Sequence, residues 1–183
     1  QALTATFQLA NDIDLAATVT WDAGRGWRPI GDATNRFTGS FDGAGYTISN
    51  LTVNRPATTY QGLFGFLDGA TVENLHLENV SVQGSAYTGG LAGLANNSAI
   101  ETVHITGEIN GGSNTGGLVG NLNSGSSVSY ASSAATVRGG SSTGGLVGYM
   151  TSASDTIYHA YSLGTVQSSG DVGGLVGYIY MGS

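Results

Sequence analysis

The chain contains no cysteine and no lysine, and only 9% of its 183 residues are charged. Without cysteine it can form neither a disulfide nor a thiolate nucleophile. Without lysine it lacks a Gly-Lys-Ser/Thr phosphate loop, although glycine-rich tracts are frequent. The five basic residues are arginines, and the formal net charge of −7 disfavours binding to nucleic acid, which needs clustered basic residues.

Long apolar runs are also missing, so we expect neither a secretory leader nor membrane insertion of this sequence. The negative charge equally disfavours attraction to anionic lipid. Apolar residues nevertheless make up 40% of the chain, which is too many for a disordered segment. The most abundant special residue is glycine, with 31 copies, against 2 prolines. Glycine at this frequency favours tight corners over helices.

A Gly-Leu-x-Gly tract recurs five times, beginning at Gly62, Gly90, Gly117, Gly145 and Gly174. The leucines of these tracts lie 28, 27, 28 and 29 residues apart, at Leu63, Leu91, Leu118, Leu146 and Leu175. A period in this range marks an array of supersecondary units, each of which buries its apolar face against its neighbours. The spacing therefore predicts a repeat protein.

Each repeat divides into three short segments separated by glycine, serine and asparagine clusters. The segment after the tract opens with one aliphatic residue, which is Val72, Ile100, Val128 or Ile157. The segments are too short for independent helices and lack the i, i+3, i+4 spacing of apolar residues. Their alternation indicates strands with one buried face. We therefore predict an all-β fold, a single-stranded parallel β-helix (β-solenoid), expected to be right-handed, with three short strands per coil of about 28 residues.

The whole chain, 1–183, is predicted to be one β-solenoid domain. Residues 1–60 lack the tract and are expected to form irregular opening coils, because terminal repeats are atypical. Residues 61–183 hold the regular repeats. Stacked coils about 4.8 Å apart would place the five tract leucines over one another as a core ladder. Each buried leucine of this ladder should contribute roughly 1.5–3 kcal/mol.

The tracts and the stretch before them resemble proteins that carry the GLUG motif. The resemblance covers the repeats from about residue 60 onward and extends to Asn11–Leu15, Trp27–Gly31 and Phe41–Leu51. Alanine stands in the third and fourth copies, at Ala131 and Ala160, where the motif often has cysteine. The resemblance implies a large secreted or surface-exposed microbial protein, either adhesin-like or flanking an extracellular peptidase. No catalytic residue belongs to the motif, so the resemblance carries no enzyme activity and no cofactor.

Stacking would also bring polar side chains together on the outer surface. His76 and His104 would neighbour each other, as would Glu73 and Glu101, but structural metal sites usually need four ligands. A pair of carboxylates one coil apart satisfies the spacing of a glycosidase, yet any solenoid stacks any outward residue. We therefore predict no metal site and no catalytic site, and interpret the acidic pair as a solvated ladder.

Three further groups of side chains are candidates for ligand binding. Asp12, Asp14, Asp22 and Asp32 are interpreted as turn caps, because no calcium-loop pattern accompanies them. A column of one threonine per coil is too sparse for an ice-binding face; it consists of Thr88, Thr115 and Thr143. Aromatic residues suit either packing or stacking on sugars, and both readings stay open for Trp21, Trp27, Tyr60, Tyr87, Tyr149 and Tyr158.

The ends of a β-helix expose unpaired backbone groups, which natural proteins cover or use. We expect no capping helix at either end of this sequence. Apolar residues in the first and last coils form the predicted assembly interface, which consists of Leu3, Phe7, Leu9, Leu175, Val176, Tyr178, Ile179 and Tyr180. Pairing of the last coil with the first coil of another copy would propagate head to tail as a filament.

The function predicted from these patterns is that of an extracellular or cell-surface structural protein, adhesin-like, assembling end to end or with neighbouring modules of a longer surface protein. A carbohydrate-binding or carbohydrate-active β-helix is the first alternative, with a glycan as partner. The stalk of a larger secreted peptidase is the second. Neither alternative assigns catalytic residues to this chain.

Overall fold

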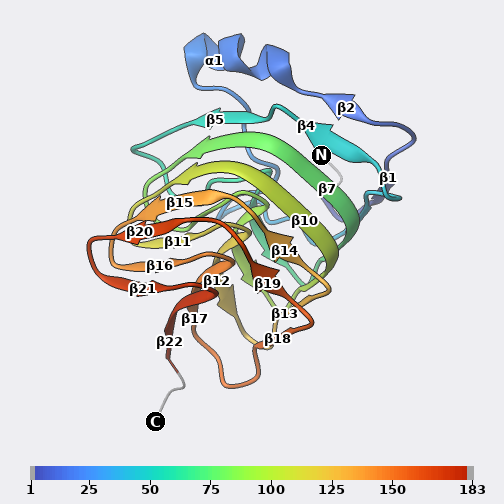
Figure 1. Ribbon diagram of the computed structural model, residues 1–183. Coiled ribbons are helices and arrows are strands. Elements are labelled where there is room, and N and C mark those ends of the chain that lie inside the picture. The colour runs from blue at the N-terminus through green and yellow to red at the C-terminus, as the bar shows by residue number, and fades with distance from the viewer. Residues whose placement is uncertain (1–2, 181–183) are drawn as a thin grey trace.

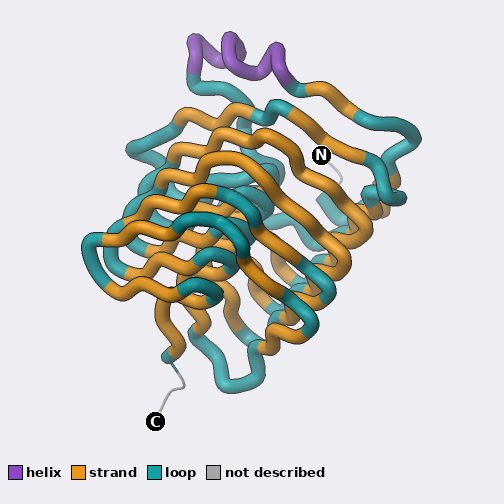
Figure 2. Tube along the Cα trace, in the orientation of Figure 1, coloured by secondary structure: helices purple, strands orange, loops and turns teal. Residues whose placement is uncertain are grey.

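The computed structural model describes residues 3–180 as a stack of parallel β-coils, a β-solenoid (Figure 1). The chain starts at one end of the stack and finishes at the other. Glycine- and asparagine-rich corners separate the strands, and each coil lies against the next along the whole trace (Figure 2). The predicted all-β parallel solenoid with a spacing of about 28 residues is confirmed. The five strands of one sheet mark about five turns.

Three sheets line the solenoid, and every pairing between named strands is parallel. The second sheet has five strands, which are β6 (Phe64–Asp68), β9 (Ala92–Asn96), β12 (Val119–Asn123), β17 (Val147–Met150) and β22 (Val176–Ile179). The third sheet has four, which are β8 (Thr88–Gly89), β11 (Asn114–Gly116), β16 (Ser142–Gly144) and β21 (Asp171–Gly173).

The first sheet has 13 strands and runs the full length of the stack. Its opening strands are β1 (Thr6–Gln8), β2 (Ile13–Asp14), β3 (Ser40–Asp42), β4 (Thr47–Ser49) and β5 (Thr52–Asn54). The middle strands are β7 (Thr71–Gln83) and β10 (Ala99–Asn110). The closing strands are β13 (Ser127–Ser129), β14 (Ser132–Ser133), β15 (Thr136–Gly139), β18 (Thr156–Tyr158), β19 (Tyr161–Ser162) and β20 (Val166–Ser168).

One strand of each middle coil is longer than the short segments predicted from the sequence. Strands β7 and β10 run for 13 and 12 residues and bend around a corner of the solenoid. A left-handed residue with φ between 50° and 54° lies at this corner in four coils. Asn74 and Thr102 lie within β7 and β10, whereas Tyr130 and His159 lie between the separate strands of the next two coils. A residue with positive φ turns the chain without interrupting the pairing on either side, so alternation alone does not reveal the corner.

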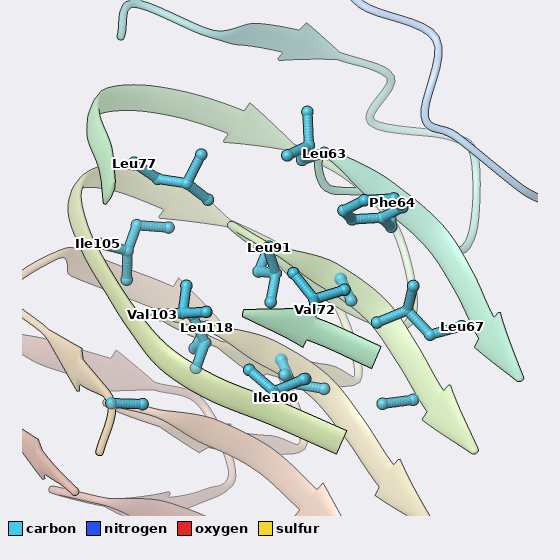
Figure 3. Close-up of a cluster of buried hydrophobic side chains, with 14 of the residues drawn as sticks. Leu63, Phe64, Leu67, Val72, Leu77, Leu91, Ile100, Val103, Ile105 and Leu118 are labelled. Carbon is cyan, nitrogen blue, oxygen red and sulfur yellow. The ribbon is translucent and has the colours of Figure 1, made fainter. Parts of the chain in front are cut away.

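Inward-facing apolar residues form continuous columns through the stack (Figure 3). Val72 of β7 pairs with Ile100 of β10, and Ile100 pairs with Val128 of β13. All three side chains are fully buried. Because like residues repeat in each coil, every core side chain packs against its counterparts above and below it. The stability of one coil is therefore shared with its neighbours, as in other repeat arrays.

The glycines of the repeated tract are required by the close approach of successive coils. A Cβ atom on Gly117 would lie 2.1 Å from Ser133 Oγ and 2.2 Å from the carbonyl oxygen of Gly145 in the next coil. Gly174 holds the same position in the last tract and has nothing within 4 Å of such a Cβ. At this first position of the tract the requirement for glycine is therefore imposed by the following coil, whereas at the last position, as in Gly177, a Cβ would meet backbone atoms of the preceding coil.

The expectation that no helix covers the first end of the stack is wrong. Helix η1 (Ala16–Thr20) and the short turn α1 (Trp21–Gly24) cross this end beside β5 (Figure 1). Thr18 is fully buried there, and its Oγ1 accepts a 3.0 Å hydrogen bond from the backbone N–H of Thr52. The segment supplies a side-chain acceptor to one edge N–H of the first coil, which explains why a short, irregular helix can lie there.

Candidate functional site

The five tract leucines lie in one column at the inner surface of the solenoid. Backbone hydrogen bonds join consecutive coils at this column, from Leu91 N to Leu118 O (3.0 Å) and from Leu118 N to Leu146 O (2.9 Å). Leu63, Leu91, Leu118 and Leu146 are at most 2% exposed, and Leu175 in the last coil is half-buried. The column is apolar throughout, so its role is packing.

The acidic pair lies on the outer surface of the first sheet. Glu73 of β7 and Glu101 of β10 are register partners, and Asp42 of β3 and Ser129 of β13 continue the column. Glu101 is exposed and Glu73 half-buried. The two carboxylates project from adjacent rungs of one flat surface, whereas a glycosidase places its pair across a cleft that holds the sugar. Their arrangement is that of a solvated ladder.

The two histidines are also register partners, with ring centroids 5.2 Å apart. His104 Nδ1 lies 2.8 Å from Ser132 Oγ in the next coil, and burial, followed by the neighbouring His76, lowers the pKa of His104 below its ordinary value. Within residues 3–180, no group of three or more histidine, aspartate or glutamate side chains is placed to hold a metal ion. The histidines therefore form a stacked surface pair with one hydroxyl partner.

The threonine column faces the interior rather than the surface. Thr88, Thr115 and Thr143 are fully buried. Thr88 Oγ1 donates to the Ser85 carbonyl oxygen at 3.2 Å, and Thr143 Oγ1 donates to Ser168 Oγ at 3.0 Å. These hydroxyls serve corners of the coils, so they present no flat array to ice or to any other ligand.

The predicted assembly residues occupy the two ends of the stack. Phe7 of β1 is 44% exposed, and its ring lies 6.2 Å from that of buried Phe37. Leu3 and Leu9 are half-buried beside it. In the last coil Tyr178, Ile179 and Tyr180 are exposed by 42% to 51%, whereas Leu175 and Val176 are half-buried. Whether these surfaces pair with another coil stays a prediction.

Ladders of polar side chains, which the sequence analysis missed, run along the outside of the stack. In the longest, Arg36 Nη1 donates to Asp68, and Asn96 Nδ2 donates to Asp68 Oδ1 at 2.6 Å. The chain of bonds continues through Asn123 to Thr151 Oγ1, which donates to Asn123 Oδ1 at 2.7 Å. The spacing of Asn96 and Asn123 by 27 residues is the signal that could have revealed it.

Several hollows lie in the irregular first coils. A cleft of about 590 Å³ opens between segments 22–34 and 55–61, and we call it the N-terminal cleft. A cavity of about 370 Å³ adjoins it and shares Asp22 and Arg28, with Trp21 and Trp27 in its wall. Four of the five arginines of the chain lie before residue 60. The sequence pattern did not predict that the two segments, which are about 30 residues apart, lie side by side.

A continuous stack of parallel coils, apolar inside and polar outside, defines a β-solenoid module. The chain belongs to the family described as the N-terminal region of the M26 IgA1-specific metallo-endopeptidases, whose family model matches residues 1–107. The GLUG resemblance remains a prediction. Of the residues described, no helix has the length and apolar character needed to cross a bilayer.

The structure is similar to a solved IgA1 protease, with a TM-score of 0.67 and 27% identity over 98% of this chain and 14% of that one. In sequence it is 47% identical to halomucin of Haloquadratum walsbyi over 90 residues, which are 46% of this chain and 1% of halomucin. It is 44% identical to a putative Gly-rich membrane protein of Evansella cellulosilytica over 82 residues, 43% of this chain and 9% of that protein. The chain thus corresponds to a small part of each of these longer proteins.

Proposed function

We propose that this chain is a non-catalytic, extracellular β-solenoid module that holds neighbouring parts of a longer secreted or surface protein at a fixed separation. The observation that carries the proposal is a continuous column of register partners in the first sheet, to which Thr6, Thr71 and Thr156 belong and which runs from the first coil to the last. A stack joined by side-chain columns inside and hydrogen bonds between all coils resists bending, which is what a spacer requires.

The comparisons support the location and the non-catalytic role. The matching family model describes the N-terminal region of a peptidase, and the chain overlaps 14% of a solved IgA1 protease. The hollow beside the histidine pair is small, about 200 Å³, and among the described residues neither this pair nor the acidic pair belongs to a group of three or more side chains that could hold a metal ion. A role as the stalk of a peptidase and a role in a surface protein both use the same physical property, which is a rigid and regular rod.

The finer part of the proposal is an adhesin-like role with contacts at the end of the stack. We propose that the exposed edge of the last coil pairs with another coil, supplied by an adjoining module or by a second copy of the chain. Exposed apolar residues on that coil favour this contact: Leu163 is 75% exposed and Val172 is 56% exposed. An open strand edge that carries apolar side chains is a template for such pairing.

Rigidity can be tested by measuring one distance across the stack. Thr6 and Thr156 are both exposed and lie five rungs apart in one column, so their backbones should be separated by roughly 24 Å. Spin labels on Thr6→Cys and Thr156→Cys face no competing native cysteine. Pulsed electron paramagnetic resonance should give one narrow distance distribution, and a broad one would overturn the spacer role.

A further inference from the structure

The N-terminal cleft is built by residues that the repeat does not require. Two segments of irregular backbone, 22–34 and 55–61, form its walls and hold three arginines and two aspartates. Its volume of about 590 Å³ lies within the range of small-molecule sites. The hollow beside His76 and His104 in the repeats is about 200 Å³, so the N-terminal cleft is the larger of the two.

Ion pairs hold the walls of the cleft together, and one arginine of the lining takes part in none of them. Arg55 donates from Nη2 to Asp22 Oδ2 at 2.6 Å and from Nε to the Trp27 carbonyl oxygen at 3.1 Å. Arg25 pairs with the other oxygen of Asp22. Asp32 accepts hydrogen bonds from the backbone N–H groups of Asn35 and Thr34, which lower its pKa below the ordinary value, and the charge of Arg28 adds a smaller lowering. Arg28 forms no ion pair with any of residues 3–180.

Arg28 is placed where a ligand would meet it. It is exposed, and it lines the cleft, the adjoining cavity of about 370 Å³ and a third cavity of about 580 Å³ on the other side of segment 27–32. The cleft is lined by three arginines and two aspartates, and two of the arginines pair with Asp22. The lining therefore carries one surplus positive charge, although the whole chain has a net charge of −7. One surplus guanidinium suits one carboxylate, whereas a polyanion would be repelled by the rest of the molecule.

An aromatic wall stands beside this arginine. Trp21 is 45% exposed, and its ring stacks on that of Trp27 with centroids 6.1 Å apart and an interplanar angle of 28°. The Trp27 ring is held in place by a hydrogen bond, because its Nε1 donates to the Leu63 carbonyl oxygen at 3.1 Å. A fixed indole pair with one open side offers a flat apolar surface to a ring-shaped ligand.

The floor and the far wall of the cleft are polar. Gln61 is only 3% exposed, and its Nε2 donates to the carbonyl oxygens of Thr59 and Tyr60, but its Oε1 has no hydrogen-bond partner among the described residues. Thr34, Thr58 and Thr59 add exposed hydroxyl side chains. A buried acceptor without a partner is costly, and a bound polar group or a water molecule it retains would remove that cost.

We propose that the N-terminal cleft and the adjoining cavity, which share Asp22 and Arg28, together bind a carboxylated sugar residue, of the uronic or sialic acid type. The indole pair would stack on the sugar ring, Arg28 would bind its carboxylate, and the threonine hydroxyls and amide groups would meet its hydroxyls. A peptide carboxylate would use Arg28 equally well, but it would leave the flat indole surface and the row of hydroxyls without partners. The activity goes beyond the spacer role, which holds whether or not the cleft is occupied.

Intrinsic fluorescence reports on this site alone, because Trp21 and Trp27 are the two tryptophans of the chain. Titration with the monosaccharide galacturonate and with N-acetylneuraminate, in separate arms, should quench or shift the emission in at least one arm. The methyl ester of galacturonate, which lacks the negative charge, should bind at least about tenfold more weakly, since a charged hydrogen bond is lost.

Variants separate the cleft from general charge effects. Arg28→Ala should weaken binding about tenfold or more and Arg28→Lys less, while Arg138→Ala, an exposed arginine of β15, should leave binding unchanged. All three variants should keep the thermal midpoint of the parent chain. The proposal is overturned if neither acidic sugar changes the emission at 10 mM, if the methyl ester binds as well as the acid, if Arg138→Ala weakens binding as much as Arg28→Ala, or if a peptide with a free C-terminal carboxylate binds more tightly than either sugar.

Discussion

Asn96 donates its side-chain amide to Asp68 across 2.6 Å and so ties β9 to the preceding strand β6 on the outside of the solenoid. The same relationship recurs in the first sheet, where Asn50 donates to Asp14 and Asn74 donates to Asp42. In each of these three pairs the acceptor is an aspartate. Charge-assisted hydrogen bonds therefore reinforce the irregular end of the stack, where the apolar columns are least complete.

These aspartates should make the first coils sensitive to acid. Hydrogen bonds lower the pKa of Asp14, Asp42 and Asp68, chiefly the bond from Asn50 to Asp14, the backbone N–H of Ala44 to Asp42 and the bond from Asn96 to Asp68. Because the folded pKa is depressed, this stabilisation is present above the unfolded value of 3.8 and disappears as the pH falls below it. Circular dichroism melts should therefore show a steady thermal midpoint from pH 7 to pH 5 and a fall below about pH 4.

Replacing one anchor tests the origin of that fall. Asp68→Asn should reduce the drop of the thermal midpoint below pH 4, while Asp171→Asn at the other end of the stack should leave the drop intact. Asp171 is exposed and accepts no side-chain hydrogen bond among the described residues. An equal effect of both substitutions would show that total charge, rather than the ladder, governs acid stability.

Truncating one leucine of the core column should destabilise several coils at once. Leu118 is fully buried between Leu91 and Leu146, so Leu118→Ala should lower the free energy of unfolding by about 2–5 kcal/mol. Leu163→Ala removes a leucine that is 75% exposed and should change it by no more than about 0.5 kcal/mol. Urea denaturation measures both, and equal losses for the two variants would contradict a shared core column.

Two glycines at the same position of the repeat should differ in their effect on stability when each is replaced by alanine. Gly117→Ala drives a Cβ into Ser133 and the Gly145 carbonyl oxygen, and should cost about 1–3 kcal/mol. Gly174→Ala meets nothing within 4 Å and should be neutral within about 0.5 kcal/mol. Thermal denaturation of the two variants compares a covered rung with an open one. Similar destabilisation in both would mean that backbone conformation, not the overlying coil, selects glycine.

The exposed edge of the last coil should govern any self-association of the isolated chain. Ile179 is 47% exposed on β22, and Ile179→Asp places a charge on the edge that we propose to pair. Sedimentation velocity should show fewer end-to-end species for this variant than for the parent chain. Asn97→Asp, at an exposed residue between β9 and β10 in the middle of the stack, controls for added charge. Assemblies that persist in Ile179→Asp would exclude this edge as the contact.

The spacing of the tract leucines was sufficient to predict the solenoid, because a period that brings like residues into register has few other structural solutions. Alternation failed at the corners inside β7 and β10, where Asn74 and Thr102 adopt positive φ without glycine. Asparagine is the common non-glycine residue in this conformation, so Asn74 offered a hint, but Thr102 offered none.

The N-terminal cleft could not be predicted from the repeat. It depends on an ion pair between Asp22 and Arg55, residues 33 positions apart in a region without periodicity. Local patterns report which side chains share a strand face, but they do not report which two loops meet. Only the concentration of arginines before residue 60 pointed to this region, and that signal alone does not distinguish a site from a solvated surface.

Pairing each strand with the strand one repeat earlier has a consequence for how the chain acquires its shape. Each new coil finds its template already formed, so folding can advance from the first residues onward while the remainder is still being synthesised or threaded through an export channel. The contacts between coils span about 28 residues, as between Thr71 and Ala99, so each step closes a loop of the same modest length. Growth by such increments lets a very long protein of this kind fold vectorially, at a cost in time that rises in proportion to its length.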